Sequence, residues 1–174
     1  MGGRVEWSAV VQAFVDISES VHVDAAPDLV WSLVSDINRH PQFAGPKSIT
    51  KAIEFDGALV PGANWIAHEK FGPQKFDAPS EITQVDPGHE LVWVSFPPMK
   101  DSDRGEGGRV FWSYTVEPDD QGTQLTHSMQ VLPPEKGAWM VKAMYAVLRL
   151  PTQQRRGIQT SLANIKTAAE KAVH

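Results

Sequence analysis

Residues 14–24 read FVDISESVHVD, and polar residues alternate with mostly apolar ones along this stretch. A period of two is typical of a β-strand that buries one face. The side chains expected on the buried face are Val15, Ile17, Glu19, Val21 and Val23. The stretch therefore predicts the first strand of a sheet, with the Glu19 carboxylate among its inward-facing side chains.

The chain that follows this strand predicts a short helical segment and a turn. Pro27 favours a helix start, because proline at the first helical position loses no hydrogen bond that the helix needs. Apolar residues recur at helical spacing as far as Ile37, and Pro41 is expected to end the run. Residues 41–46 (PQFAGP) predict a loop or short turn.

Six further strand-like segments fill the middle of the chain, separated by turn signals rich in glycine, proline and aspartate. Closely spaced strands joined by short turns form antiparallel meanders rather than β–α–β units. The longest polar connection, residues 97–108, is expected to be mobile. We expect strands over residues 48–55, 63–71, 75–85, 90–96, 109–117 and 123–132.

The last third of the chain predicts helices. Residues 135–150 are apolar almost all round, and Pro151 is expected to interrupt them. Residues 153–173 have an amphipathic pattern, whose apolar stripe is expected to lie on the sheet. The stripe consists of Ile158, Leu162, Ile165, Ala169 and Ala172.

Together these elements predict an α+β fold in one domain over residues 1–174, with residues 1–12 as a flexible lead. A sheet of seven strands must bury one face, and few helices are available to cover it. A twisted antiparallel sheet that curves around the long C-terminal helix solves this problem, with the short helical segment following the first strand. Such a curve leaves room for an apolar cavity between sheet and helix.

Composition argues against several classes of protein. The net charge of −5 disfavours a nucleic-acid partner, and the absence of cysteine removes disulfides, thiolate chemistry and cysteine zinc sites. The six histidines have no metal-like spacing, and no nucleotide-binding or hydrolase motif occurs. Neither a signal-peptide core nor a membrane-spanning apolar run is visible. We therefore expect a cytoplasmic protein that uses no metal or other cofactor.

Five stretches, taken in order, resemble the polyketide cyclase/dehydrase and lipid-transport superfamily, the START/Bet v 1-like helix-grip proteins. The resemblance covers nearly the whole chain and implies the helix-grip fold. It implies no single function, because the superfamily includes lipid carriers, ubiquinone-binding proteins and cyclases. The stretches are VHVDAAPDLVWSLVSDINRHPQFAG (21–45), PGANWIAHEKF (61–71), EITQVDPGHELVWV (81–94), WSYTVEPDDQGTQLTH (112–127) and RRGIQTSLANIKTAAE (155–170).

Strand alternation also predicts which polar side chains face the cavity. Four polar residues, Glu19, Glu69, Tyr114 and His127, fall in otherwise apolar rows. Burial perturbs the pKa of a carboxylate or an imidazole, which suits acid–base chemistry or the anchoring of a ligand's polar head. The candidate ligand-binding residues are Glu19, Trp65, Trp112, Tyr114, His127, Met129, Met140 and Met144.

Each polar candidate also has a purely structural interpretation. Glu19 could pair with a neighbouring strand, and Glu69 could lie on an exposed rim. His127 could be a satisfied core imidazole, and Tyr114 a core aromatic residue whose hydroxyl finds a partner. A one-residue slip at a bulge would reverse every face assignment in that strand. The Arg155–Arg156 pair is interpreted as a solvated helix start.

The apolar segment 135–150 has several interpretations of its own. Met140 and Met144 could gate the cavity mouth, since methionine adapts to varied apolar shapes. Ordinary packing, a homodimer contact or contact with a membrane surface would also explain an apolar helix here. A partner-regulating module built on the same fold would use this segment as its contact.

Two functions fit the candidate residues. The first is binding of a hydrophobic small molecule, such as a lipid, an isoprenoid or a polyketide-like compound, in the internal cavity. The second is a cofactor-independent polyketide aromatase/cyclase that catalyses aldol cyclisation and dehydration. In that enzyme His127 or Glu69 would be the general base, and Tyr114 would stabilise the enolate oxygen. The residues alone leave open whether the chain catalyses a reaction.

Overall fold

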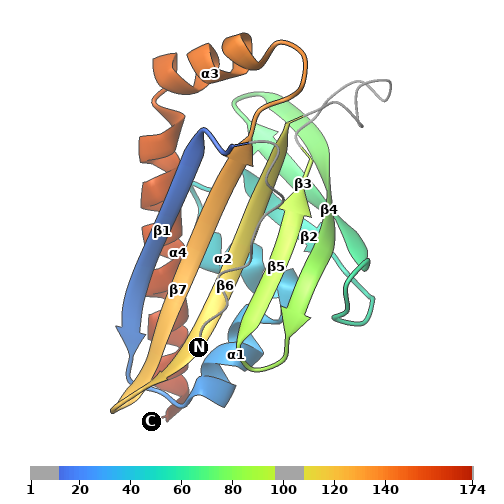
Figure 1. Ribbon diagram of the computed structural model, residues 1–174. Coiled ribbons are helices and arrows are strands. Elements are labelled where there is room, and N and C mark those ends of the chain that lie inside the picture. The colour runs from blue at the N-terminus through green and yellow to red at the C-terminus, as the bar shows by residue number, and fades with distance from the viewer. Residues whose placement is uncertain (1–11, 97–107, 174) are drawn as a thin grey trace.

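The computed structural model describes residues 12–96 and 108–173, which form one seven-stranded antiparallel sheet and four α-helices (Figure 1). The strand order across the sheet is β1-β7-β6-β5-β4-β3-β2, so the first and last strands are neighbours. The strands are β1 (Val15–Val23), β2 (Thr50–Glu54), β3 (Asn64–Phe71), β4 (Gln74–Asp86), β5 (Glu90–Ser95), β6 (Arg109–Asp119) and β7 (Gly122–Leu132). The helices are α1 (Pro27–Val34), α2 (His40–Ala44), α3 (Ala138–Val147) and α4 (Leu150–Val173).

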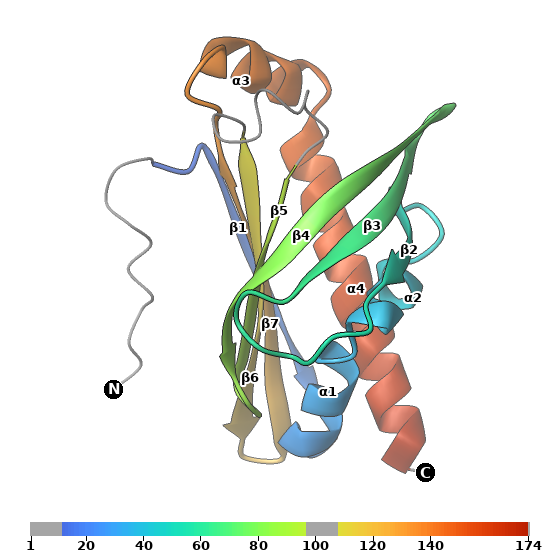
Figure 2. The same cartoon turned by 90° about the vertical axis from the view of Figure 1, so that its right-hand side faces the viewer.

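The sheet curves around the side on which the long helix α4 lies (Figure 2). α4 packs along β1 and β7 and against α1 and α2. It buries the apolar stripe expected from the sequence, except that Ala172 is exposed in the last turn. The predicted fold class, a curved antiparallel sheet around a long C-terminal helix, is confirmed.

All seven predicted strands are present, and the rows on β1, β6 and β7 alternate as expected, whereas β5 buries four consecutive residues, 91–94. β1 pairs with β7 without a register shift, from Val15 opposite Val131 to Val23 opposite Thr123. Every second residue of β7 is buried, beginning at Thr123. Register shifts occur only between β2 and β3 and between β4 and β5 among the described strand pairs. The rows that carry the candidate residues on β1, β6 and β7 are therefore free of the slip that would reverse them.

Gly122, the first residue of β7, lies very close to the backbone at the end of β1. A Cβ built on Gly122 would lie 2.3 Å from the carbonyl oxygen of Val23, so only glycine fits there without a backbone shift. The hydroxyl of Thr123 donates a hydrogen bond to the carbonyl of Ala25, at 2.7 Å. The start of β7 is thus fixed against the end of β1.

Two prolines begin helices where the sequence predicted an interruption. α1 ends at Val34, and after a 3-10 turn (Ile37–Arg39) a second helix, α2, begins at His40 with Pro41 in its first turn. Likewise Pro151 lies in the first turn of α4, and the break falls at Arg149, whose φ is 50°. Proline in a first helical turn lacks only an N–H that has no partner in the helix. Pro41 therefore lies inside a helix rather than ending one, in a stretch (41–46) expected to be a loop or short turn. The interruption expected at Pro151 is present and falls two residues earlier, at Arg149.

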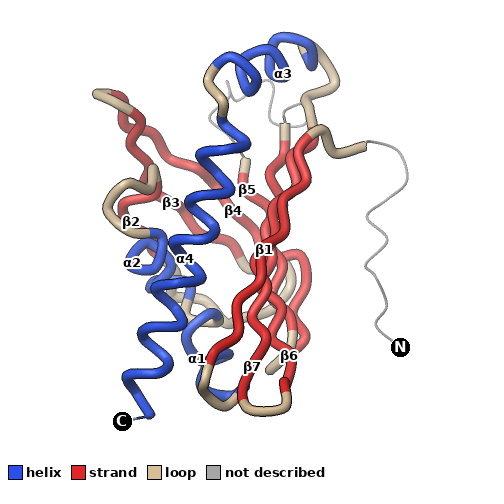
Figure 3. The backbone as a smooth tube through the Cα atoms, turned by 90° about the vertical axis from the view of Figure 1, so that its left-hand side faces the viewer, coloured by secondary structure: helices blue, strands red, loops and turns tan. Residues whose placement is uncertain are grey.

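α3 lies at one end of the molecule, beyond the ends of the strands (Figure 3). It contacts the start of α4, and the described residues of α3 include none that is buried. None of the described helices is long and apolar enough to cross a membrane. The flexible lead expected over residues 1–12 and the mobile connection expected over 97–108 lie almost entirely outside the described residues.

Candidate functional site

Three of the four polar candidates lie in one row across the inner face of the sheet. Glu19 on β1 is opposite His127 on β7, and His127 is opposite Tyr114 on β6. The next residue in the row is Leu91 on β5. Strand register therefore brings together side chains that are up to 108 positions apart in the sequence (from 19 to 127).

An aromatic cluster surrounds this row. The rings of His127 and Tyr114 are stacked, with centroids 4.1 Å apart and an interplanar angle of 17°. Trp93 stacks on Trp112, with centroids 6.3 Å apart, and also contacts both rings of the stacked pair. His40, the first residue of α2, contacts Tyr114 at 5.4 Å. We call these residues and Trp65, which contacts Trp93, the aromatic cluster.

The polar atoms of the cluster are only partly satisfied. Nδ1 of His127 donates a hydrogen bond to the carbonyl of Ser113, at 2.8 Å, and this assigns the proton to Nδ1 and leaves Nε2 as an acceptor. Nε2 of His40 donates to the carbonyl of Val34, at 2.7 Å. Among the described residues no hydrogen bond of His127 Nε2 or of the Tyr114 hydroxyl is seen, although the fully buried side-chain polar atom without a partner there is Gln154 Oε1. The His127 and Tyr114 side chains are nevertheless buried, with exposures of 5% and 2%.

Burial keeps the cluster uncharged. Loss of hydration lowers the pKa of His127 from 6.5 to about 4, against the opposing hydrogen bond to Ser113. Desolvation also lowers the pKa of His40. It raises the pKa of the Tyr114 hydroxyl well above its ordinary value. At neutral pH the cluster therefore presents two neutral imidazoles and a neutral phenol.

Glu19 is held by the long helix rather than left free in the row. Arg155 of α4 forms a salt bridge with its Oε1, and Nε2 of Gln159 donates to Oε2 at 3.1 Å. Arg155 is exposed, in line with its interpretation as a solvated residue, and its guanidinium also reaches across to the first strand. The contact fixes α4 against β1 at the end of the polar row.

Glu69 lies apart from the other polar candidates. It is on β3, where it accepts a hydrogen bond from the Thr50 hydroxyl at 3.2 Å. Desolvation raises its pKa, and the hydrogen bond from Thr50 opposes this. Glu69 is opposite Phe76 of β4, whereas the row of Tyr114 and Leu91 meets β4 at Val85, so the two rows lie nine residues, or roughly 30 Å, apart along the strand. Glu69 and Tyr114 therefore do not form one catalytic pair in this structure.

The apolar candidates also divide into two groups. Trp65 and Met129 are buried and Trp112 is half-buried, all within or beside the aromatic cluster. Met140 and Met144 are exposed on α3, at the end of the molecule. Sequence reasoning missed His40, whose place in the cluster depends on how α2 is oriented. A lone histidine before a proline gives no signal of that orientation.

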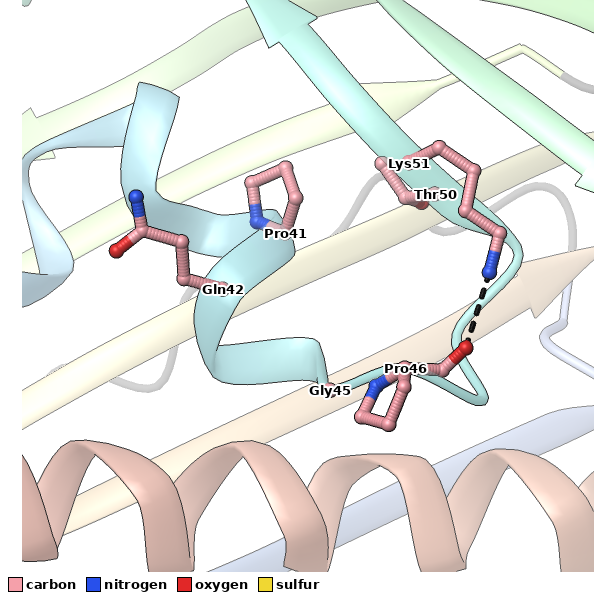
Figure 4. Close-up of a pocket in the computed structure, with 6 residues that line it drawn as sticks. All are labelled: Pro41, Gln42, Gly45, Pro46, Thr50 and Lys51. Atoms are coloured by element: carbon pink, nitrogen blue, oxygen red, sulfur yellow. Dashed lines mark hydrogen bonds between the residues drawn. The ribbon is translucent and has the colours of Figure 1, made fainter.

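Two of the surface hollows bordered by described residues lie away from the aromatic cluster. One, of about 280 Å³, lies between α2 and β2 and is bordered by Pro41 and Thr50 and by Lys51, which donates to the Pro46 carbonyl (Figure 4). The other, of about 300 Å³, lies between β1 and the start of α4, beside Arg155. The large internal cavity expected from the sequence stays a prediction. Among the described residues, no group of three metal-binding side chains occurs.

Comparison with known proteins identifies a family that the sequence of this chain matches. Residues 15–170 match a family model described as polyketide cyclase / dehydrase and lipid transport. A search of curated proteins found no match.

Several solved structures have the same fold. The Polyketide_cyc-like protein Cgl2372 from Corynebacterium glutamicum is 22% identical, with a TM-score of 0.59 over 91% of this chain and 93% of that one. The Zhui aromatase/cyclase from Streptomyces sp. R1128 is 17% identical, with a TM-score of 0.61 over 91% and 95%. The di-domain aromatase/cyclase StfQ is 15% identical, with a TM-score of 0.65 over 91% of this chain and 51% of that one. At these identities the likeness concerns the fold alone.

Proposed function

The chain belongs to the polyketide cyclase/dehydrase and lipid transport family, and from this premise we propose that it binds a hydrophobic small molecule between the sheet and α4. The observation that carries the proposal is the stacked pair of His127 and Tyr114, whose Nε2 and hydroxyl show no hydrogen bond to a described residue. Lipids, isoprenoids and polyketide-like compounds have the matching chemistry, a large apolar body with few polar groups.

The stacked pair favours an uncharged head group. Nε2 of His127 accepts a hydrogen bond, and the Tyr114 hydroxyl donates or accepts one. A ligand hydroxyl can donate to Nε2 or accept from the Tyr114 hydroxyl, whereas a ligand carbonyl can only accept from Tyr114. A carboxylate head would bring a charge into the cluster without a cation to meet it, because Arg155 is already bound to Glu19. The proposed ligand is therefore an alcohol or a ketone rather than an acid.

The aromatic cluster would supply the apolar contact. Each Å² of apolar surface that the ligand removes from water contributes about 25 cal/mol. Trp93, Tyr114 and His127 have little exposed surface, so the ligand enters only as side chains of the cluster change rotamer. Such movement changes the surroundings of Trp93 and Trp112, and tryptophan fluorescence can follow it.

A matched pair of ligands tests the proposal. Tryptophan fluorescence is recorded while the protein is titrated with a long isoprenoid alcohol, and then with the hydrocarbon of the same skeleton. We expect Tyr114→Phe to weaken binding of the alcohol about two- to ten-fold, the effect of one neutral hydrogen bond, and to leave the hydrocarbon unaffected. Native mass spectrometry of the purified protein would identify a ligand that copurifies with it.

The proposal fails if neither compound binds. It also fails if both bind but Tyr114→Phe changes the two affinities equally, since the hydroxyl would then have no special relation to the head group. Trp139→Phe, on exposed α3, is the control for a change of aromatic side chain outside the cluster.

Cyclisation of a polyketide is the second candidate function, and the close stacking of His127 on Tyr114 favours it. Aldol closure needs a base for an α-proton and a donor for the enolate oxygen. His127 Nε2 and the Tyr114 hydroxyl are the two groups available side by side. However, a base whose pKa is about 4 is weak at neutral pH, and for this reason binding ranks first.

Turnover of a polyketide mimic separates the two candidates. If cyclisation occurs, we expect His127→Ala and Tyr114→Phe each to lower kcat, and kcat/KM to fall as the pH drops through about 4. Turnover that survives both substitutions would exclude these roles.

A further inference from the structure

α3 exposes an unusual number of large apolar side chains. Trp139 and Val147 have exposures of 73% and 80%, although both are types that normally bury their surface. Half of the ten large exposed apolar side chains in the described chain belong to α3 and the residue that follows it, namely Trp139, Met140, Met144, Val147 and Leu148. A contiguous patch of this kind marks an interaction site.

The patch faces away from the rest of the protein. Trp139, Ala143 and Val147 are four residues apart in turn, so they follow one side of the helix, and all three are exposed. The opposite side carries Tyr145, whose ring makes an edge-on contact with Phe14 at 5.1 Å. The outward side of α3 therefore has no covering element among the described residues, and Figure 3 shows the helix projecting at the end of the molecule.

Positive charge surrounds the patch in an otherwise acidic chain. Residues 136–169 contain six lysines and arginines and no aspartate or glutamate, whereas the whole chain has a net charge of −5. Lys142 lies on the flank of α3, with its ammonium 5.9 Å from the Phe14 ring centroid, and Arg149 ends the connection to α4. Arg155 pairs with Glu19 and Lys166 pairs with Glu170, so the border of the apolar face consists of Lys142 and Arg149. The apolar face thus has a cationic border.

We infer that α3 is a docking surface for an anionic lipid bilayer. An exposed apolar helix with tryptophan and a basic border lies in the membrane interface, with the apolar side chains among the acyl chains and the cations at the lipid phosphates. A second copy of the chain fits less well. A two-fold dimer through this patch would bring the same cations face to face, with no acidic residue on α3 to pair with them.

Flotation of the full-length protein with vesicles tests the inference. We expect binding to vesicles of phosphatidylcholine and phosphatidylserine, weaker binding to phosphatidylcholine alone, and loss of binding as salt is raised. The double variant Trp139→Asp/Val147→Asp should lose binding. Lys142→Gln and Arg149→Asn should each weaken it about five-fold. Asparagine is chosen at Arg149 because it tolerates the positive φ.

Val60→Asp is the matched control, since Val60 is an exposed apolar residue on a loop far along the chain from α3. It should bind vesicles like the unchanged protein. Thermal unfolding of every variant verifies that the fold is intact. Titration with the isoprenoid alcohol separates this surface from the aromatic cluster, because the α3 variants should retain ligand affinity.

Absence of binding to the anionic vesicles would overturn the inference. So would equal binding to both vesicle compositions, which would leave the cations without a role. Sedimentation at several protein concentrations tests the rival occupant. A dimer that the double variant disrupts, in a protein that ignores vesicles, would assign α3 to a second copy instead.

Discussion

The aromatic cluster and α3 use similar side chains in opposite environments. Trp93 is 8% exposed and lies on β5, which pairs with β4 on one side and with β6 on the other. Trp139 is exposed and lies on α3, a helix without a buried residue. The apolar side chains of the cluster hold the sheet together, and those of α3 add little to the core. Packing within the chain accounts for the burial of the first region, whereas the exposed side chains of the second are the basis of the membrane contact inferred above.

Replacing one tryptophan from each region tests this contrast most strongly. We expect Trp93→Ala to lower the free energy of unfolding by about 3–5 kcal/mol, because it leaves a cavity between β4 and β6. Trp139→Ala should change it by no more than about 0.5 kcal/mol. Urea denaturation measures both. Similar costs would mean that α3 is part of the core after all.

The pH dependence of stability should come from the cluster. The folded protein holds His127 neutral down to about pH 4, whereas the unfolded chain binds that proton below about 6.5. The contribution of His127 to the free energy of unfolding is therefore fully present above pH 6.5, and it falls by roughly 3 kcal/mol as the pH drops towards 4. His40 acts in the same direction, and the exposed His22 and His68, whose pKa values are raised, act in the opposite one.

His127→Phe isolates the effect of the one imidazole. We expect this variant to have a flatter stability profile between pH 6.5 and 4, measured by urea denaturation at each pH. A slope identical to that of the unchanged protein would show that His127 is accessible to protons in the folded state.

Alanine substitution at two glycines compares a position that neighbouring backbone covers with a position that is open. Gly122→Ala should destabilise the protein by about 1–3 kcal/mol, because its Cβ meets the Val23 carbonyl oxygen. Gly157→Ala, on α4 with nothing within 4 Å of its Cβ, should stabilise it by about 0.5–1 kcal/mol. Thermal unfolding of the two variants gives both signs. A neutral Gly122→Ala would mean that the β1–β7 junction adjusts easily.

A small effect on stability is expected from removal of the Tyr114 hydroxyl. Because no hydrogen bond joins it to a described residue, Tyr114→Phe should change the free energy of unfolding by less than about 1 kcal/mol. The same substitution should weaken binding of an alcohol or ketone ligand. A large loss of stability without ligand would instead make the hydroxyl a structural group.

The period-two alternation in the sequence predicted the sheet and the inward rows, because a buried face leaves its pattern in each strand separately. This was enough to place Glu19, Tyr114 and His127 on the inner face. It could not show that Arg155 binds Glu19, since the partners are 136 residues apart and come from different elements. Nor could it show that Glu69 lies apart from Glu19, Tyr114 and His127, because the residues of a single strand do not indicate the order of strands across the sheet.

The proline positions had a different cause of error. Pro41 was expected to end a helical run and Pro151 to interrupt residues 135–150, and both occupy the first turn of the helix that follows. Proline is compatible with either place, and the choice depends on the residues before it. At Arg149 the backbone turns left-handed, which is an uncommon conformation for a residue other than glycine.

The most direct measurement is the nitrogen chemical shift of His127 Nε2 in isotope-labelled protein while the isoprenoid alcohol is added. If the cluster binds the head group, the Nε2 shift should move as the ligand hydroxyl donates to it, and resonances of α3 should stay in place. An unchanged Nε2 shift, with movement confined to α3, would contradict the account, because the ligand would then be bound on the exposed helix.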